Sequence, residues 1–190
     1  AMMNRGIEVA IDGDIIRMND FTWNLSANFS YNKNKLLELY NGVEEYVNST
    51  TGLKYMVGHS VTEYFLNRYA GVNPANGDAL WYTADGELTT EFREDDKVMT
   101  GKTYESPWAG GFGTTFIWKG ISLSAQFSWM AKRYVMNNDR FFEESNGIYS
   151  TYNQSKRLLY NRWKKPGDIT DIPRYDVPVS YTHLRAHETV

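Results

Sequence analysis

Strict alternation between apolar and polar side chains is the feature that most constrains how this chain folds. Between positions 21 and 32 every odd residue is apolar and every even residue is polar and uncharged. Successive side chains of a β-strand point to opposite faces. The segment therefore predicts a strand with one apolar face and one polar face. The apolar positions are Phe21, Trp23, Leu25, Ala27, Phe29 and Tyr31.

Three more segments repeat this alternation. They are residues 7–17, 108–118 and 121–131. The polar face of the first carries Glu8, Asp12 and Asp14, and paired carboxylates can act as acid and base in glycoside hydrolysis. The inner face of a membrane barrel is polar by default, so we interpret the three acids as a wetted surface.

The turn of the first hairpin tests the pattern, because a register slip of one residue would move every side chain to the wrong face. A three-residue loop over 18–20 pairs Arg17 with Phe21 and keeps both apolar sets together. The same register places Ile15 opposite Trp23. We therefore predict an antiparallel hairpin closed by this loop.

A second hairpin is predicted by the segments on either side of Lys119 and Gly120. A two-residue turn there pairs Trp118 with Ile121, which again keeps the apolar faces matched. Glycine suits a tight hairpin turn of this length. Two independent turns thus agree with the alternation.

The connections have very unequal lengths. Both hairpin turns have two or three residues, whereas residues 33–107 separate the hairpins and another long segment follows Lys132. Short turns on one side and long loops on the other are typical of outer-membrane barrels. We predict an all-β fold of antiparallel strands from a transmembrane β-barrel, with long, partly structured extracellular loops. Four strands are too few to close a barrel, so the sheet should be open.

Aromatic residues make up 15% of the chain, an unusually large share that bears on which face meets the membrane. In a membrane barrel, aromatic side chains gather in girdles at the two membrane–water interfaces. We expect five aromatic residues of the alternating segments to face lipid and to be exposed in the isolated chain. They are Trp23, Phe29, Phe116, Trp118 and Phe127.

The long loops contain strand-like stretches at 61–69 and 79–83 and a helical spacing over 152–163. Aromatic residues of the loops either stack on sugar rings or pack the loop against itself. Packing is favoured, because loops of this length need internal contacts. Four residues remain candidates for ligand binding. They are Tyr64, Tyr69, Trp81 and Tyr82.

No residue pattern points to catalysis, a cofactor or a metal, so we do not expect an enzyme. Cysteine is absent, which removes thiol chemistry and cysteine-bound zinc. His183 and His187 have the spacing of helical metal ligands, but no third ligand is evident nearby. The balance of 20 Lys+Arg against 23 Asp+Glu gives no indication of a nucleic-acid partner.

Three strings stand out beside the strand pattern. The first combines NRGIE at 4–8, Trp23 and NFSYNKNK at 28–35. The second is YAGVNPANGDALW at 69–81, and the third is RWKKPGDITDIPR at 162–174. In order and spacing they resemble the SusC/RagA family of TonB-dependent outer-membrane transporters, the first as a barrel hairpin and the others as loops. The resemblance covers about residues 4–176.

The resemblance implies a large barrel with an N-terminal plug, which imports glycans or peptides with energy from TonB. It implies a SusD-like surface lipoprotein as partner, closing over the extracellular loops, and outer-membrane lipid around the barrel. The implied location is the bacterial outer membrane. We expect this chain to cover only a late stretch of the barrel, without the plug region through which the TonB complex is contacted.

We divide the chain into a partial barrel at 1–176 and a tail at 177–190. The family pattern would continue into further strands after Arg174, but the sequence departs from it. The tail resembles a spurious ending found in translated sequence fragments. We therefore expect it to be non-native or disordered.

Two other classes of protein remain open at this point. One is a secreted carbohydrate-binding β-sandwich, and the other is a glycan-cleaving enzyme domain. A sandwich buries the apolar face of its strands, whereas a barrel turns that face to lipid. A glycosidase needs two carboxylates at a suitable separation, and the sequence offers no convincing pair.

Overall fold

The computed structural model describes residues 1–48, 53–145, 149 and 151–175. Its contacts divide the chain into two compact units. The described residues of the first unit fall within 1–64 and 101–134, and those of the second within 65–100 and 135–175. The tail predicted at 177–190 lies outside the described residues.

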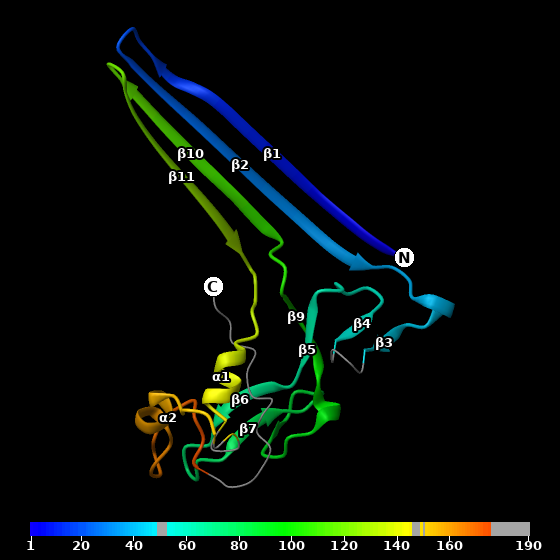
Figure 1. Cartoon of the computed structure of the whole chain (residues 1–190). Helices are drawn as coiled ribbons and strands as arrows, with labels where there is room; N and C mark the ends of the chain where they lie inside the picture. Colours follow the sequence, from blue (N-terminus) through cyan, green and yellow to red (C-terminus); the bar gives the residue numbers. More distant parts are fainter. Residues whose placement is uncertain (49–52, 146–148, 150, 176–190) are drawn as a thin grey trace. The chain divides into compact units, whose positions relative to one another are not determined.

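A four-stranded sheet makes up most of the first unit (Figure 1). Its strands lie in the order β1-β2-β10-β11, and every neighbouring pair is antiparallel. This confirms the predicted all-β fold with an open sheet. The strands are β1 (Met2–Arg17), β2 (Phe21–Leu36), β10 (Trp108–Trp118) and β11 (Ile121–Ala131).

The turn between β10 and β11 forms as predicted. Trp118 pairs with Ile121 across a two-residue turn. Both turn residues have positive φ, 46° at Lys119 and 85° at Gly120. Two central residues with positive φ define the type of hairpin turn whose twist matches that of the strands. The predicted register therefore holds along the whole of this hairpin.

The register between β1 and β2 was predicted correctly for most of its length but wrongly beside the turn. From Asp14, which pairs with Asn24, to Met2 the pairs follow the predicted register. Nearer the turn, Ile16 rather than Ile15 pairs with Trp23, and the register shifts between Asp14 and Ile16. A β-bulge at Ile15 takes up one residue.

The physical reason for the bulge is a shorter turn. The Met18 N–H donates to the Phe21 carbonyl oxygen at 2.7 Å, so only Asn19 and Asp20 lie between the closing residues. Without the bulge, this turn would place every apolar residue of one strand opposite polar residues of the other. Ile15 and Ile16 are both apolar, so either can occupy the apolar face.

The two hairpins are joined by pairing between β2 and β10. Phe21 pairs with Trp118 near the turns. The Lys119 N–H donates to the Asp20 carbonyl oxygen at 3.0 Å, so both turns lie at the same end of the sheet. The long segment between β2 and β10 therefore leaves and re-enters the sheet at the opposite end.

Shorter strands form small sheets outside the large one. Strand β3 (Glu45–Val47) pairs with β4 (Lys54–Met56), and β5 (Glu63–Leu66) pairs with β9 (Val98–Thr103). The buried Glu63 carboxylate accepts the Gly101 N–H at 2.6 Å and lies 3.0 Å from His59 Nδ1. These bonds fix the start of β5 against β9. A 3-10 turn, η1, covers Tyr40–Gly42.

The described part of the second unit contains a three-stranded sheet and two short α-helices. The strands are β6 (Arg68–Val72), β7 (Ala79–Tyr82) and β8 (Leu88–Thr89). The helical elements are η2 (Glu94–Asp96), α1 (Asn138–Glu143) and α2 (Lys156–Asn161). The buried apolar residues of this unit include Ala79, Trp81, Leu158 and Ile172.

The helical spacing over 152–163 is realised only in part. Helix α2 begins after Ser155, whose side chain accepts the Arg157 N–H as an N-cap, and it ends at Asn161. Tyr152 and Trp163 lie outside it. Among the described residues, no helix is both long and apolar enough to cross a membrane.

Candidate functional site

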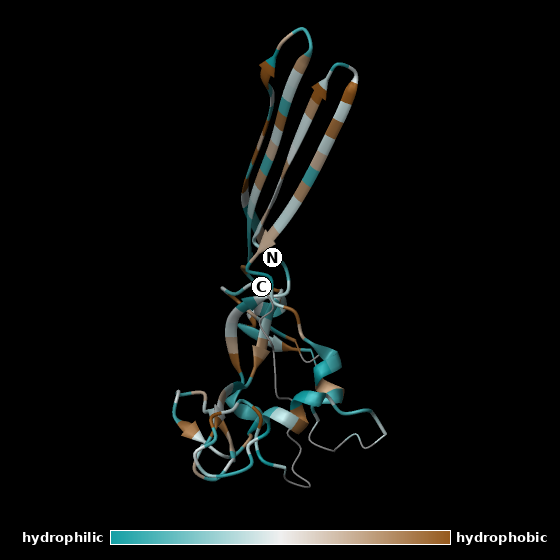
Figure 2. Ribbon diagram, turned by 90° about the vertical axis from the view of Figure 1, so that its left-hand side faces the viewer, coloured by the Kyte–Doolittle hydropathy of each residue, from teal (hydrophilic) through white to brown (hydrophobic). Residues whose placement is uncertain are grey.

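The cross-strand register gives the large sheet one apolar and one polar face. Paired residues of neighbouring strands point to the same side. On the apolar face one row reads Val9, Phe29, Gly110 and Trp129. On the polar face one row reads Asp12, Ser26, Gly113 and Gln126. Figure 2 shows the resulting alternation of hydrophobic and hydrophilic bands along the strands.

The apolar face is uncovered along much of its extent. Of the five aromatic residues expected to face lipid, Phe29, Trp118 and Phe127 are 37%, 55% and 53% exposed. Trp23 and Phe116 are half-buried because their rings stack on each other, with centroids 5.6 Å apart. The aliphatic residues Ile7, Val9, Ile11, Ile121 and Leu123 of this face are also exposed.

On the apolar face, aromatic residues gather near the turns and near the start of β10, and the Phe112 and Phe127 rings stack between these two groups at 4.7 Å. Near the turns the stacked rings are those of Phe21, Trp23 and Phe116, with Trp118 beside them. Near the other end, the contacting rings are those of Phe29, Tyr31, Trp108 and Trp129. Trp108 and Trp129 lie in the alternating segments 108–118 and 121–131, but they are not among the five aromatic residues that the sequence pattern singled out as facing lipid.

The length of β10 and β11 fits the apolar thickness of a bilayer. Strands β10 and β11 each have 11 residues. At about 3.3 Å per residue and a tilt of about 40°, such a strand rises roughly 25–30 Å. The apolar band of an outer-membrane barrel is about 25 Å tall and carries an aromatic girdle at each border.

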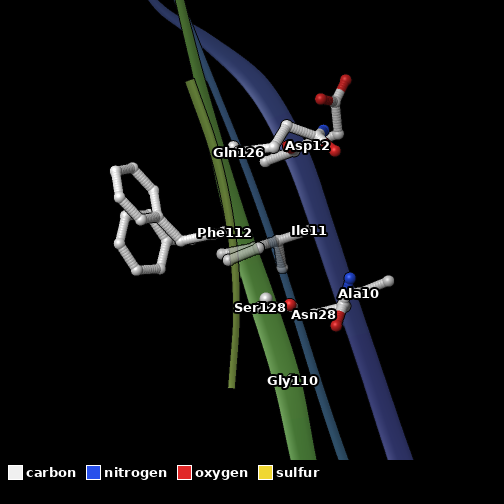
Figure 3. Close-up of a pocket in the computed structure, with 13 residues that line it drawn as sticks. Ala10, Ile11, Asp12, Asn28, Gly110, Phe112, Gln126 and Ser128 are labelled. Atoms are coloured by element: carbon white, nitrogen blue, oxygen red, sulfur yellow. The ribbon is translucent and has the colours of Figure 1, made fainter.

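The polar face offers hydroxyl and amide groups. A shallow hollow of about 460 Å³ opens on the sheet, with Ser26, Asn28, Gln126 and Ser128 among its lining residues. Figure 3 shows Phe112 on the opposite side of the sheet from Asp12. Within the described residues, no group of three or more His, Cys, Asp or Glu could hold a metal ion.

The four candidate ligand-binding residues of the loops are divided between the two units. Tyr64 belongs to the first unit, where its hydroxyl donates to the Tyr134 carbonyl oxygen at 3.2 Å. Tyr69, Trp81 and Tyr82 belong to the second unit. The Tyr69 and Trp81 rings meet edge to face at 5.2 Å.

Trp81 packs the second unit from within. Its side chain is 1% exposed and also contacts the Phe92 ring edge to face at 5.1 Å. Its ring is therefore enclosed within the second unit. Tyr82 is 36% exposed, and the Arg68 guanidinium lies over its ring at 5.5 Å.

Comparison of the sequence with known proteins found relatives among TonB-dependent receptors. TonB-dependent receptor P39 of Formosa agariphila is 26% identical over 226 residues, covering 92% of this chain and 21% of the relative. TonB-dependent receptor P3 of the same organism is 25% identical over 190 residues, covering 90% of this chain and 18% of the relative. No family model matches the chain.

Solved structures of a peptide transporter share the fold. The structure of the RagAB peptide transporter superposes with a TM-score of 0.84 at 32% identity, covering 96% of this chain and 21% of that chain. The RagAB peptide importer in its open-open state gives a TM-score of 0.84 at 31% identity. The chain thus spans about a fifth of the length of the relatives it matches.

Proposed function

Since the chain is SusC/RagA-like and forms part of a TonB-dependent transporter of the bacterial outer membrane, we propose that it contributes barrel wall and extracellular loops to an importer of large nutrients. The observation that carries the proposal is the register of the large sheet, which gives an exposed apolar face and a polar face. In a barrel these faces meet lipid and lumen.

The uncovered apolar face argues against a carbohydrate-binding β-sandwich. A sandwich packs the apolar faces of two sheets together as its core. Here Phe127, Leu123 and Ile121 on β11 are all more than half exposed. The likeness to RagAB also supports a barrel segment. The named relatives are receptors and transporters, which is consistent with a protein that is not an enzyme.

For the whole transporter, we propose import energised through TonB and a SusD-like lipoprotein partner over the loops. The support is the likeness to TonB-dependent receptors and to the RagAB peptide transporter. The substrate is a glycan or a peptide, and the RagAB likeness favours a peptide. Within this chain we propose Tyr82 as a ligand-facing residue, with Tyr69 and the buried Trp81 supporting the hairpin from its other face.

A pair of neighbouring substitutions tests the assignment of the faces. Phe127→Arg in the full-length transporter would place a charge on the lipid side of β11, and an arginine near the bilayer midplane costs about 2–4 kcal/mol. We expect a marked fall in the amount of folded barrel in the outer membrane, measured by heat-modifiable migration on gels. Ser128→Arg adds the same charge on the polar face and is the matched control.

The expected result for Ser128→Arg is near-normal assembly with altered substrate uptake. Equal assembly of both variants would contradict the assignment of Phe127 to lipid. A fall in the amount of folded barrel for Ser128→Arg alone would show that the two faces are reversed.

A further inference from the structure

The two loop strings that resemble family signatures contact each other in the second unit. Residues 69–81 form most of the β6–β7 hairpin, and we call its connecting residues 73–78 the turn. Residues 162–174 follow α2, and we call them the strap. The Trp163 indole N–H donates to the Pro74 carbonyl oxygen at 3.0 Å, and the Gly167 N–H donates to the same oxygen at 2.8 Å.

Gly77 is the point of closest approach between turn and strap. It is buried, with φ at +79°, and a Cβ there would lie 2.4 Å from the Trp163 ring and 3.0 Å from Arg174 Cβ. The Arg174 N–H donates to the Gly77 carbonyl oxygen at 2.9 Å, and Arg174 Nε pairs with Asp78 Oδ1 at 2.9 Å. Backbone conformation and space both require glycine at this position.

The strap is held in shape by its own bonds. The Asp168 carboxylate accepts the N–H groups of Lys164 and Lys165 at 2.9 and 3.0 Å. These backbone hydrogen bonds lower the pKa of Asp168. The Trp163 N–H donates to the Ile172 carbonyl oxygen at 3.0 Å. The strap therefore presents Trp163 and Arg174 to the turn from a closed, hydrogen-bonded loop.

We infer that turn and strap form a latch that joins the segment between β2 and β10 to the segment after β11, so that these parts of the two loops move as one body. The bonds at Pro74, Gly77 and Asp78 span the turn from one side to the other. The latch also orients the hairpin, because the Tyr69 hydroxyl donates to the Asp171 carbonyl oxygen at 3.1 Å.

Hydrogen exchange in the full-length transporter tests the latch. Trp163→Ala removes the ring over Gly77 and the bond to Pro74, so we expect amide exchange in peptides covering 69–81 to accelerate about tenfold or more. Trp163→Phe keeps an aromatic ring and should give a smaller acceleration. Tyr160→Ala removes an exposed aromatic side chain just before the strap and is the control, expected to leave 69–81 unchanged.

Unchanged exchange at 69–81 in Trp163→Ala would overturn the latch, whether or not exchange rises in the strap.

A second test changes the turn instead of the strap. Gly77→Ala should also accelerate exchange, and combining it with Trp163→Ala should give less than the product of the two effects, because the added methyl group collides with the Trp163 ring. Independent effects would contradict the docking of that ring on Gly77. Neither measurement requires a substrate, so both are separable from the proposed import function.

Discussion

Gly110 shows, at the scale of single residues, what the alternating pattern leaves out. It occupies a position on the apolar face, where the pattern calls for a large side chain. A Cβ there would lie 2.6 Å from the Asn28 carbonyl oxygen and 2.8 Å from the Trp129 ring. The Phe29 and Trp129 rings, from the strands on either side, contact each other at 6.1 Å. Aromatic cover of a strand glycine is a known device for stabilising sheets.

Asp168 gives a prediction of pH dependence at this scale. Its pKa is lowered in the folded protein by the bonds from Lys164 and Lys165, so its contribution to stability is full above the unfolded value of about 3.9. That contribution is lost as pH falls through the lower folded value. We expect exchange in peptides covering 162–174 to rise as pH falls below about 4, after correction for intrinsic exchange rates.

The Asp168→Asn variant is the control for this prediction. An amide makes weaker bonds to the two N–H groups and does not titrate, so exchange of the strap should already be faster at pH 7. Because residue 168 no longer titrates in this variant, its substitution should add no further rise in strap exchange as the pH falls. A wild-type strap that behaves like the variant at pH 7 would contradict the role of the carboxylate.

At the scale of elements, both hairpins could be predicted from alternation, but the shorter first turn and the bulge at Ile15 could not. Ile15 and Ile16 are both apolar, so the pattern is compatible with either register. The pairing of β2 with β10 has no local signal, because it joins segments separated by a long loop. The contact between turn and strap was missed for the same reason. The sequence showed the two strings but not their contact.

The burial of Trp81 could not be predicted with certainty either, because the sequence allowed both packing within the loop and stacking on a ligand. A tryptophan in a strand-like loop segment fits a packing role, which the length of the loop favours, but it also fits a stacking role. Only the fold places Tyr69 and Phe92 around its ring. Tyr82, the next residue along β7, points to the other side of the strand and is exposed.

This difference between neighbours predicts opposite effects of two substitutions in β7. Trp81→Ala removes a fully buried ring and should destabilise the second unit by about 3–5 kcal/mol. Tyr82→Ala should leave its stability nearly unchanged and weaken substrate binding. Limited proteolysis reports the first effect, and titration with the transported nutrient reports the second. A normal affinity in Tyr82→Ala would remove Tyr82 from the ligand site.

At the scale of the whole molecule, the proposed function requires the large sheet to be part of a closed barrel. The edge strands of the described sheet are β1 and β11. An unpaired strand edge cannot remain in lipid. In a closed barrel both edges would pair with further strands. The relatives are about five times as long as the part this chain matches, which leaves ample room for those strands.

The most direct test is a label scan along β11 in the full-length transporter. Single cysteines at positions 121–131, in a background without other reactive cysteines, are spin-labelled in outer-membrane vesicles. Collision with oxygen reports lipid, and collision with a water-soluble nickel complex reports water. We expect a two-residue period, with odd positions such as Leu123 and Phe127 facing lipid and even positions such as Gln126 facing water. A uniform profile, or odd positions shielded from oxygen, would contradict it.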